Sequence, residues 1–139
     1  MMRIVTCVAV ALGLTGAASS VAQTKKQVEA RYTNNYNRCM NTGDAANGVT
    51  SGIMDCNDLE IDRQDARLNQ AYKMVMTRSN PQQKVVLRTS ERQWITQRDA
   101  RCKRAAASEE GGSLAGIIYS GCILDETIKR TIWLETYKG

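Results

Sequence analysis

Four cysteines constrain the fold of this chain more than any other feature of its sequence. Cys39, Cys56, Cys102 and Cys122 lie beyond an N-terminal leader that itself carries Cys7. An even number of cysteines in an exported chain is typical of a disulfide framework. The alternative is a zinc site, but structural zinc sites usually pair their ligands at C-x2–4-C spacing, and 16, 45 and 19 residues separate these cysteines. Because the spacing also leaves no redox-active C-x-x-C pair, two disulfides are expected.

The first 22 residues have the three parts of a secretory signal peptide. Arg3 supplies a positive start, an apolar run covers residues 4–14, and small residues follow up to Ala22. The run is shorter than the roughly 20 apolar residues of a membrane-spanning helix. We expect cleavage after Ala22 and a chain that is not membrane-embedded afterwards, located in the periplasm or secreted, in an envelope of the Gram-negative type. The alternative is a short membrane anchor that stays attached.

The part of the chain that remains, residues 23–139, has the size of one modest domain. The sequence contains no Phe and only two Trp, so Leu, Ile, Val, Met and Ala must supply most of the core. It also contains no His, which removes the commonest general base and the commonest protein ligand for metals. We therefore expect no catalytic residue, no metal and no other cofactor.

Charge narrows the range of partners. The full chain has 19 Lys and Arg against 14 Asp and Glu, and loss of Arg3 with the leader leaves 18 and a net charge of +4. This balance mildly favours anionic neighbours such as envelope polymers or acidic lipid headgroups. Nucleic acid is not expected as a partner, because no run of basic residues is interleaved with aromatic ones.

Three segments carry the apolar spacing of amphipathic helices, at residues 55–79, 81–107 and 114–137. Asn80 and Pro81 suit the start of the second segment, and Gly111-Gly112 suits its end. The expected buried faces are Ile61, Leu68, Tyr72 and Val75 in the first helix, Val86 or Leu87, Ser90, Trp94, Arg98, Cys102 and Ala105 in the second, and Leu114, Ile118, Cys122, Leu124, Ile128, Ile132 and Leu134 in the third.

The expected fold is all-α, a small three- to four-helix bundle stapled by two disulfides. Residues 23–54 are expected to form a polar N-terminal arm that can hold a short helix, with a loop over residues 41–51. Residues 55–139 are expected to form the helical domain.

The turn at Gly111-Gly112 favours one of the three ways to pair four cysteines. Cys102 lies about nine residues before this turn and Cys122 about ten after it, so the two lie side by side in an antiparallel helical hairpin. Cys39 and Cys56 then tie the arm to the start of the first long helix. Each disulfide closes a loop of roughly 15–20 residues, worth on the order of 3 kcal/mol in the chain-entropy model.

Acidic residues crowd the expected start of the helix at residue 55, where the helix dipole favours them. Solvated charge is the favoured interpretation. A calcium site lacks the EF-hand spacing, and a glycosidase needs two acids across a cleft, which one helix cannot show. A pair of Ser113 and Lys129 has no supporting motif. The acidic residues concerned are Asp55, Asp58, Glu60, Asp62 and Asp65.

Trp94 and Arg98 stand four residues apart, so the guanidinium can lie over the indole. We interpret this pair as a half-buried structural anchor; the alternative is a binding face. Because Arg98 falls on the apolar face, it needs a carboxylate partner. Asp65, at the edge of the first helix's apolar stripe, is the candidate.

The motifs, taken in order, resemble the lysozyme inhibitor LprI-like family. That family carries the segments C…D..LN..Y, L…QR.WI..RD..C and GGS…C…T..R, and the chain matches them from about Cys56 to Leu134. One departure is Glu91, where the family commonly has Gln; it is expected to make the local surface more acidic. Besides cysteines, the positions taken as structural or binding are Asp65, Leu68, Asn69, Tyr72, Arg92, Trp94, Ile95, Arg98, Asp99, Gly111, Gly112, Thr127 and Arg130.

The resemblance implies a small exported helical protein that binds a lysozyme-type muramidase and covers its cleft without chemistry of its own. Animal lysozymes are strongly basic, so a locally acidic face, such as Asp55 to Asp65, would have to provide the attraction. The alternative is a periplasmic envelope-binding or stress-related structural protein with an anionic polymer or a protein as partner. An enzyme is disfavoured because the sequence has no His, metal motif or nucleophile motif.

Overall fold

A computed structural model describes residues 25–109 and 111–138, and the expected signal peptide, its cleavage point and Cys7 lie outside them. Within the described part the secondary structure is helical, with no strand. The long helices are α4 (Thr50–Arg78), α5 (Pro81–Ala106) and α6 (Leu114–Thr136). A helical turn at residues 25–29, α2 (Asn34–Met40), α3 (Gly43–Ala46) and a 3-10 turn (Ala107–Glu109) complete the fold. The expected all-α bundle is confirmed.

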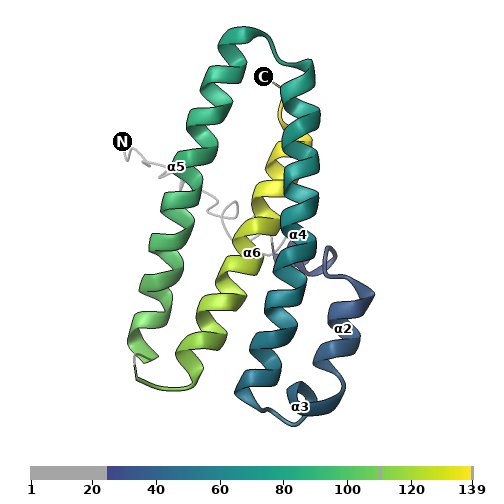
Figure 1. The fold of residues 1–139 in the computed structure, drawn as a ribbon, viewed down its shortest axis with the longest axis vertical. Helices are drawn as coiled ribbons and strands as arrows, with labels where there is room; N and C mark the ends of the chain where they lie inside the picture. The colour runs from purple at the N-terminus through teal and green to yellow at the C-terminus, as the bar shows by residue number, and fades with distance from the viewer. Residues whose placement is uncertain (1–24, 110, 139) are drawn as a thin grey trace, which may run out of the picture.

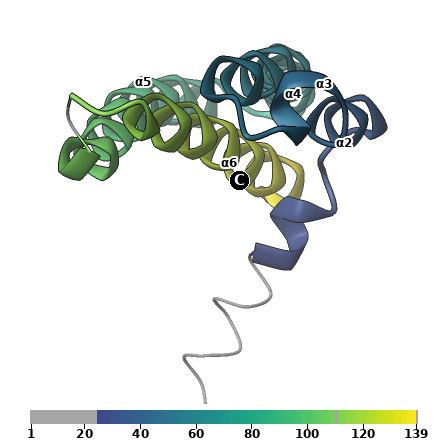
Figure 2. The same cartoon turned by 90° about the horizontal axis from the view of Figure 1, so that it is seen from below.

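The three long helices form an open arrangement (Figure 1). α6 lies between the other two and packs against both, whereas α4 and α5 diverge from the short link that joins them. Figure 2 shows the same arrangement from one end, with α2 and α3 packed beside α4. The bundle is therefore held together mainly through α6.

Both disulfides have the pairing expected from the sequence. Cys39 in α2 is bonded to Cys56 in α4, with their Cα atoms 5.7 Å apart. Cys102 in α5 is bonded to Cys122 in α6, with their Cα atoms 5.5 Å apart. One disulfide thus ties the arm to α4, and the other ties the α5–α6 hairpin.

The link between α4 and α5 has the expected cap. The Asn80 side chain accepts a hydrogen bond of 2.9 Å from the Gln83 N–H, and the Gln83 side chain accepts one of 2.9 Å from the Asn80 N–H. This reciprocal capping box satisfies two helix-end donors, and Pro81 occupies the first helical turn. At the other end of α5, Gly111 adopts φ +87°, a conformation that favours glycine. Gly112 and Ser113 then lead into α6.

The start of α4 differs from the expectation. The helix begins at Thr50 and not at residue 55, and α3 forms within the expected loop. The glycines that suggest a loop have a packing role here: a Cβ added at Gly52 would lie 2.7 Å from the Ala45 nitrogen and 2.7 Å from Asp44 Cβ. The absence of a side chain thus lets α3 pack directly on the first turn of α4. The boundary expected between residues 54 and 55 lies inside α4.

The core forms two clusters that match most of the expected apolar faces. Leu87 is fully buried and Val86 is 61 % exposed, which decides between those two candidates. Ala105 and Leu114 are exposed, contrary to expectation, because both lie on the turn side of the Cys102–Cys122 disulfide, at the end of the hairpin. The buried clusters are Leu68, Ala71, Val75, Leu87 and Leu134 in one, and Val28, Leu124 and Ile128 in the other.

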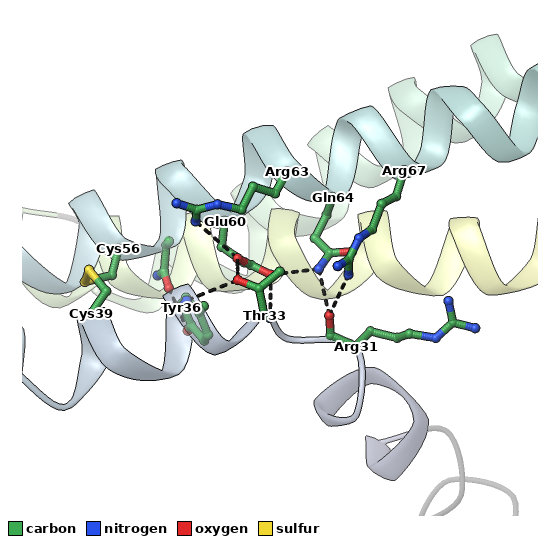
Figure 3. A network of polar contacts seen from close by, with 10 residues as sticks. Arg31, Thr33, Tyr36, Cys39, Cys56, Glu60, Arg63, Gln64 and Arg67 are labelled. Atoms are coloured by element: carbon green, nitrogen blue, oxygen red, sulfur yellow. Dashed lines mark hydrogen bonds and ion pairs between the residues drawn. A yellow bond between two sulfur atoms is a disulfide. The ribbon is translucent and has the colours of Figure 1, made fainter.

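A buried carboxylate on α4 binds the arm (Figure 3). Glu60 is fully buried, so its expected place among solvated acids is wrong. Its carboxylate accepts hydrogen bonds from the Thr33 N–H at 3.0 Å, the Thr33 hydroxyl at 2.6 Å and the Gln64 amide at 2.7 Å, and pairs with Arg63 at 3.3 Å. Burial alone would raise the pKa of Glu60, but these hydrogen bonds outweigh it and lower that pKa.

Further polar contacts continue from the arm into the bundle. The Tyr32 hydroxyl donates to Asp125 at 2.6 Å, and the Tyr36 hydroxyl donates to Asn57 at 3.0 Å. The Asn57 amide in turn donates to the Ser120 hydroxyl of α6 at 2.9 Å. The face of α4 that meets the arm and α6 is therefore partly polar, and among the described residues every buried side-chain nitrogen and oxygen has a hydrogen-bond partner.

Candidate functional site

The positions that carry the family resemblance gather mainly in one groove between α4 and α5. The groove has a volume of about 420 Å³. Its lining comes from α4 and α5, the two helices that diverge in Figure 1. Eight of its ten lining residues are resemblance positions. The α4 wall consists of Asp65, Leu68, Asn69 and Tyr72, and the α5 wall of Arg88, Glu91, Arg92, Trp94, Ile95 and Arg98.

Trp94 joins the groove to the core. Its indole is half-buried and packs against the cluster that contains Leu68, Leu87 and Leu134. The Arg98 guanidinium lies 5.0 Å from the ring centroid, as the spacing of four residues predicts. The Ile95 side chain, one residue further on, is 44 % exposed and gives the groove an apolar edge.

Arg98 does not form the expected ion pair with Asp65. Its Nε donates to Asp99 at 2.9 Å, and its Nη1 approaches the Thr127 hydroxyl of α6 at 3.4 Å. Because α4 and α5 diverge at this level, the guanidinium turns to its own helix and to α6, and a groove separates it from α4. The pKa of Asp65 is raised in the folded protein. Burial is the main cause, the negative charge of Asp62 adds to it, and the positive charge of Arg98 across the groove partly opposes it.

Arg130 of α6 binds two residues of α5, one of which lines the groove. It pairs with Glu91 at 2.6 Å and donates to the Ser90 hydroxyl at 2.8 Å. The two charged side chains are only 10 % and 12 % exposed. Glu91 therefore does not make the surface more acidic, as its departure from the family pattern suggests; it forms a charge-assisted pair inside the bundle.

The exposed face of α4 carries an acidic ridge, which consists of Asp55, Asp58, Asp62 and Asp65. Their spacing of three, four and three residues places them along one side of the helix. The first three are exposed, and none of the four forms an ion pair among the described residues. Since α4 begins at Thr50, the ridge lies beyond its first turn, and the expectation that these acids occupy a helix start is wrong. The ridge runs into the groove at Asp65.

The opposite wall is basic. Arg88 and Arg92 stand four residues apart on α5, are exposed, and form no ion pair within the described part of the chain. Arg88 was not among the expected positions, although its spacing of four residues from Arg92 is a signal that could have identified it. The groove thus has a basic α5 wall, and its α4 wall carries one carboxylate, that of Asp65.

The other expected positions lie outside the groove. Thr127 is buried beneath Arg98, and Asp99 lies beside it on α5. Gly111 and Gly112 form the turn at the far end of the hairpin. In the described residues, Cys, Asp and Glu do not gather in a group of three or more that could hold a metal ion. None of the described helices is both long and apolar enough to cross a membrane.

Comparison with known proteins gives two matches. The family model described as "Lysozyme inhibitor LprI" matches residues 39–134. The chain is 30% identical over 93 residues to the protein named "Uncharacterized protein R02472" of Rhizobium meliloti (strain 1021), and the match covers 58% of this chain and 67% of that protein. No solved structure matches the chain.

Proposed function

The chain belongs to the lysozyme inhibitor LprI family, and on that premise we propose that it binds a lysozyme-type muramidase and blocks it without chemistry of its own. The observation that carries the proposal is the groove between α4 and α5. It collects eight family-resemblance positions in one concave surface beside the acidic ridge. Leu68 belongs to the core, and Tyr72 and Trp94 pack against it. The remaining positions include the exposed Asn69, Arg92 and Ile95, and their exposure in a groove suits recognition.

Affinity would come from the groove. Tyr72, Trp94 and Ile95 give it aromatic and aliphatic surface, and buried residues of this kind supply most of the binding energy in protein interfaces. The walls are set by the Arg130–Glu91 pair and by the Cys102–Cys122 disulfide between α5 and α6. A preorganised surface loses little conformational entropy on binding, so more of the contact energy appears as affinity.

Attraction would come from the acidic ridge. The chain as a whole is basic, yet the ridge places four carboxylates side by side without a pairing cation among the described residues. A basic muramidase approaching this face meets an opposite charge, which raises the association rate and orients the encounter. Each exposed ion pair contributes only about 0.2–1 kcal/mol, so the ridge steers the partner more than it holds it.

Export and location form part of the same proposal. Two disulfides in a chain of this size are typical of an oxidising compartment. The leader over residues 1–22 supplies a route to the periplasm or the exterior, where a muramidase acts on the cell wall.

The test is a cell-wall lysis assay with an animal lysozyme and the protein purified after export from an expression host. We expect excess protein to suppress lysis. Ile95→Ala should weaken inhibition about tenfold, equivalent to about 1.4 kcal/mol, because it removes the exposed apolar edge of the groove. Val85→Ala is the matched control, since Val85 is exposed on the same helix but does not line the groove. Undiminished lysis at excess protein would refute the proposal.

A further inference from the structure

A second pocket lies against a different face of α4. It has a volume of about 460 Å³ and is lined by α4, by α6 and by Arg31 of the arm. Its size lies in the range typical of small-molecule sites. None of its lining residues belongs to the groove proposed for the muramidase.

Three arginines give this arginine pocket a positive rim. Arg31 forms a two-pronged ion pair with Glu135, with distances of 3.1 and 2.6 Å. Arg67 and Arg78 form no ion pair among the described residues; each donates to a backbone carbonyl, Arg67 to that of Arg31 at 3.0 Å (Figure 3) and Arg78 to that of Tyr137 at 2.6 Å. A carbonyl positions a guanidinium without neutralising it, so the rim keeps two positive charges in excess.

The floor of the pocket is apolar. Val75 and Leu134 are 2 % and 0 % exposed and belong to the main core cluster. Met74 is 64 % exposed at the edge, one of the most exposed apolar side chains in the described part of the chain. An inorganic anion would leave this apolar surface unused, and a neutral apolar molecule would leave the two free guanidinium charges unused.

We propose that the arginine pocket binds an anionic amphiphile, with a phosphate or carboxylate headgroup at Arg67 and an aliphatic chain against Met74, over the buried Val75 and Leu134. Guanidinium groups bind both headgroups through paired N–H donors. Each methylene that leaves water for the apolar part of the pocket adds to the affinity. The site is independent of muramidase binding, because it uses a separate face of α4.

The experiment is isothermal titration of the exported protein with dodecyl phosphate and dodecanoate, below the concentrations at which they form micelles. The comparison ligands are inorganic phosphate, which lacks the chain, and dodecyl maltoside, which lacks the charge. We expect one saturable site with at least about tenfold tighter binding of an anionic amphiphile than of either comparison ligand. Whether phosphate or carboxylate binds more tightly identifies the headgroup source. Equal binding of maltoside or of free phosphate would overturn the proposal.

Two variants locate the site. Arg67→Gln removes a headgroup contact, and Met74→Glu places a negative charge at the exposed edge without breaking a hydrogen bond. Each should weaken binding of the amphiphile at least about tenfold.

The control is Lys103→Gln, which removes one positive charge at an exposed position on α5 and should leave amphiphile binding unchanged. Met74→Glu should also retain muramidase inhibition. Full amphiphile affinity in folded Met74→Glu protein, checked by its circular dichroism spectrum, would contradict this site.

Discussion

Two guanidinium groups, one from α5 and one from α6, lie near the Trp94 ring. Arg98 of α5 lies 5.0 Å and Arg130 of α6 lies 5.7 Å from its ring centroid, and Arg130 also lies 3.8 Å from the ring of Trp133. A planar guanidinium can stack on an indole while two of its nitrogens contact one carboxylate oxygen, as Arg130 Nε and Nη2 contact Oε1 of Glu91. The structure therefore explains why arginine occupies position 130.

Arg130→Met should destabilise the protein by about 3 kcal/mol, because it leaves the mostly buried Glu91 carboxylate without its partner. Chemical denaturation measures the change in the free energy of unfolding. Glu91→Gln, which installs the residue common in the family, is the control and should cost less than about 1 kcal/mol, because the amide oxygen still accepts from the guanidinium. A loss below about 1 kcal/mol in Arg130→Met would show that the ion pair contributes little to stability.

The folded protein disfavours the charged form of Asp65. Its pKa is raised in the folded state, so ionisation costs stability at pH values above that pKa, and the cost disappears below the pKa of the unfolded chain. Asp65→Asn should therefore stabilise the protein at pH 7, with no gain in strongly acidic buffer. Thermal unfolding at the two pH values measures this. The same variant should weaken muramidase inhibition, and a loss of stability at pH 7 would contradict the assignment.

Part of the groove between α4 and α5 could be predicted from the spacing of residues in the sequence. The stacking of Arg98 on Trp94 follows from their spacing on one helix. The partner of Arg98 could not be predicted, because the choice between Asp65 and Asp99 depends on how far α4 and α5 diverge, which periodicity within one helix does not encode.

Helix ends differ in how much their caps contribute. Asn80 forms a complete capping box at the start of α5, whereas Ser113 precedes α6 without a side-chain hydrogen bond to the helix. Asn80→Ala should cost about 1 kcal/mol of unfolding free energy. Ser113→Ala should cost almost nothing and is the matched control. Denaturant titration of both variants checks the pair, and a larger loss for Ser113→Ala would contradict the cap geometry.

The long helices were predictable from apolar spacing, but the polar contacts of α4 were not. Asn57, Glu60 and Gln64 are buried on the same face as Leu68. An apolar pattern cannot identify them, since each is buried only because the arm or α6 supplies a partner. The early start of α4 was missed for the same reason, as it depends on α3 packing against Gly52.

Charge is separated across α4. The acidic ridge and the groove lie on one side of this helix, and the arginine pocket lies against another face. A net positive chain can therefore present a negative ridge to a basic protein and a positive pocket to an anionic ligand. Net charge alone, which could be read from the sequence, predicts only the second of these partners.

The ridge can be tested with two double variants that change the net charge of the protein by the same amount. Asp58→Asn with Asp62→Asn removes two ridge carboxylates, and Asp44→Asn with Glu109→Gln removes two acids elsewhere. If the ridge steers the encounter, the first pair should lower the association rate with lysozyme several-fold at low salt, and the second pair should change it little.

At about 1 M salt, where the screening length is about 3 Å, the ridge variant and the unaltered protein should associate at similar rates. Stopped-flow mixing gives the rates at each salt concentration. The dissociation rate should change less than the association rate, because exposed ridge charges orient the partner while the groove holds it. Equal effects of the two variant pairs would show that lysozyme responds only to net charge, and the ridge would then have no part in recognition.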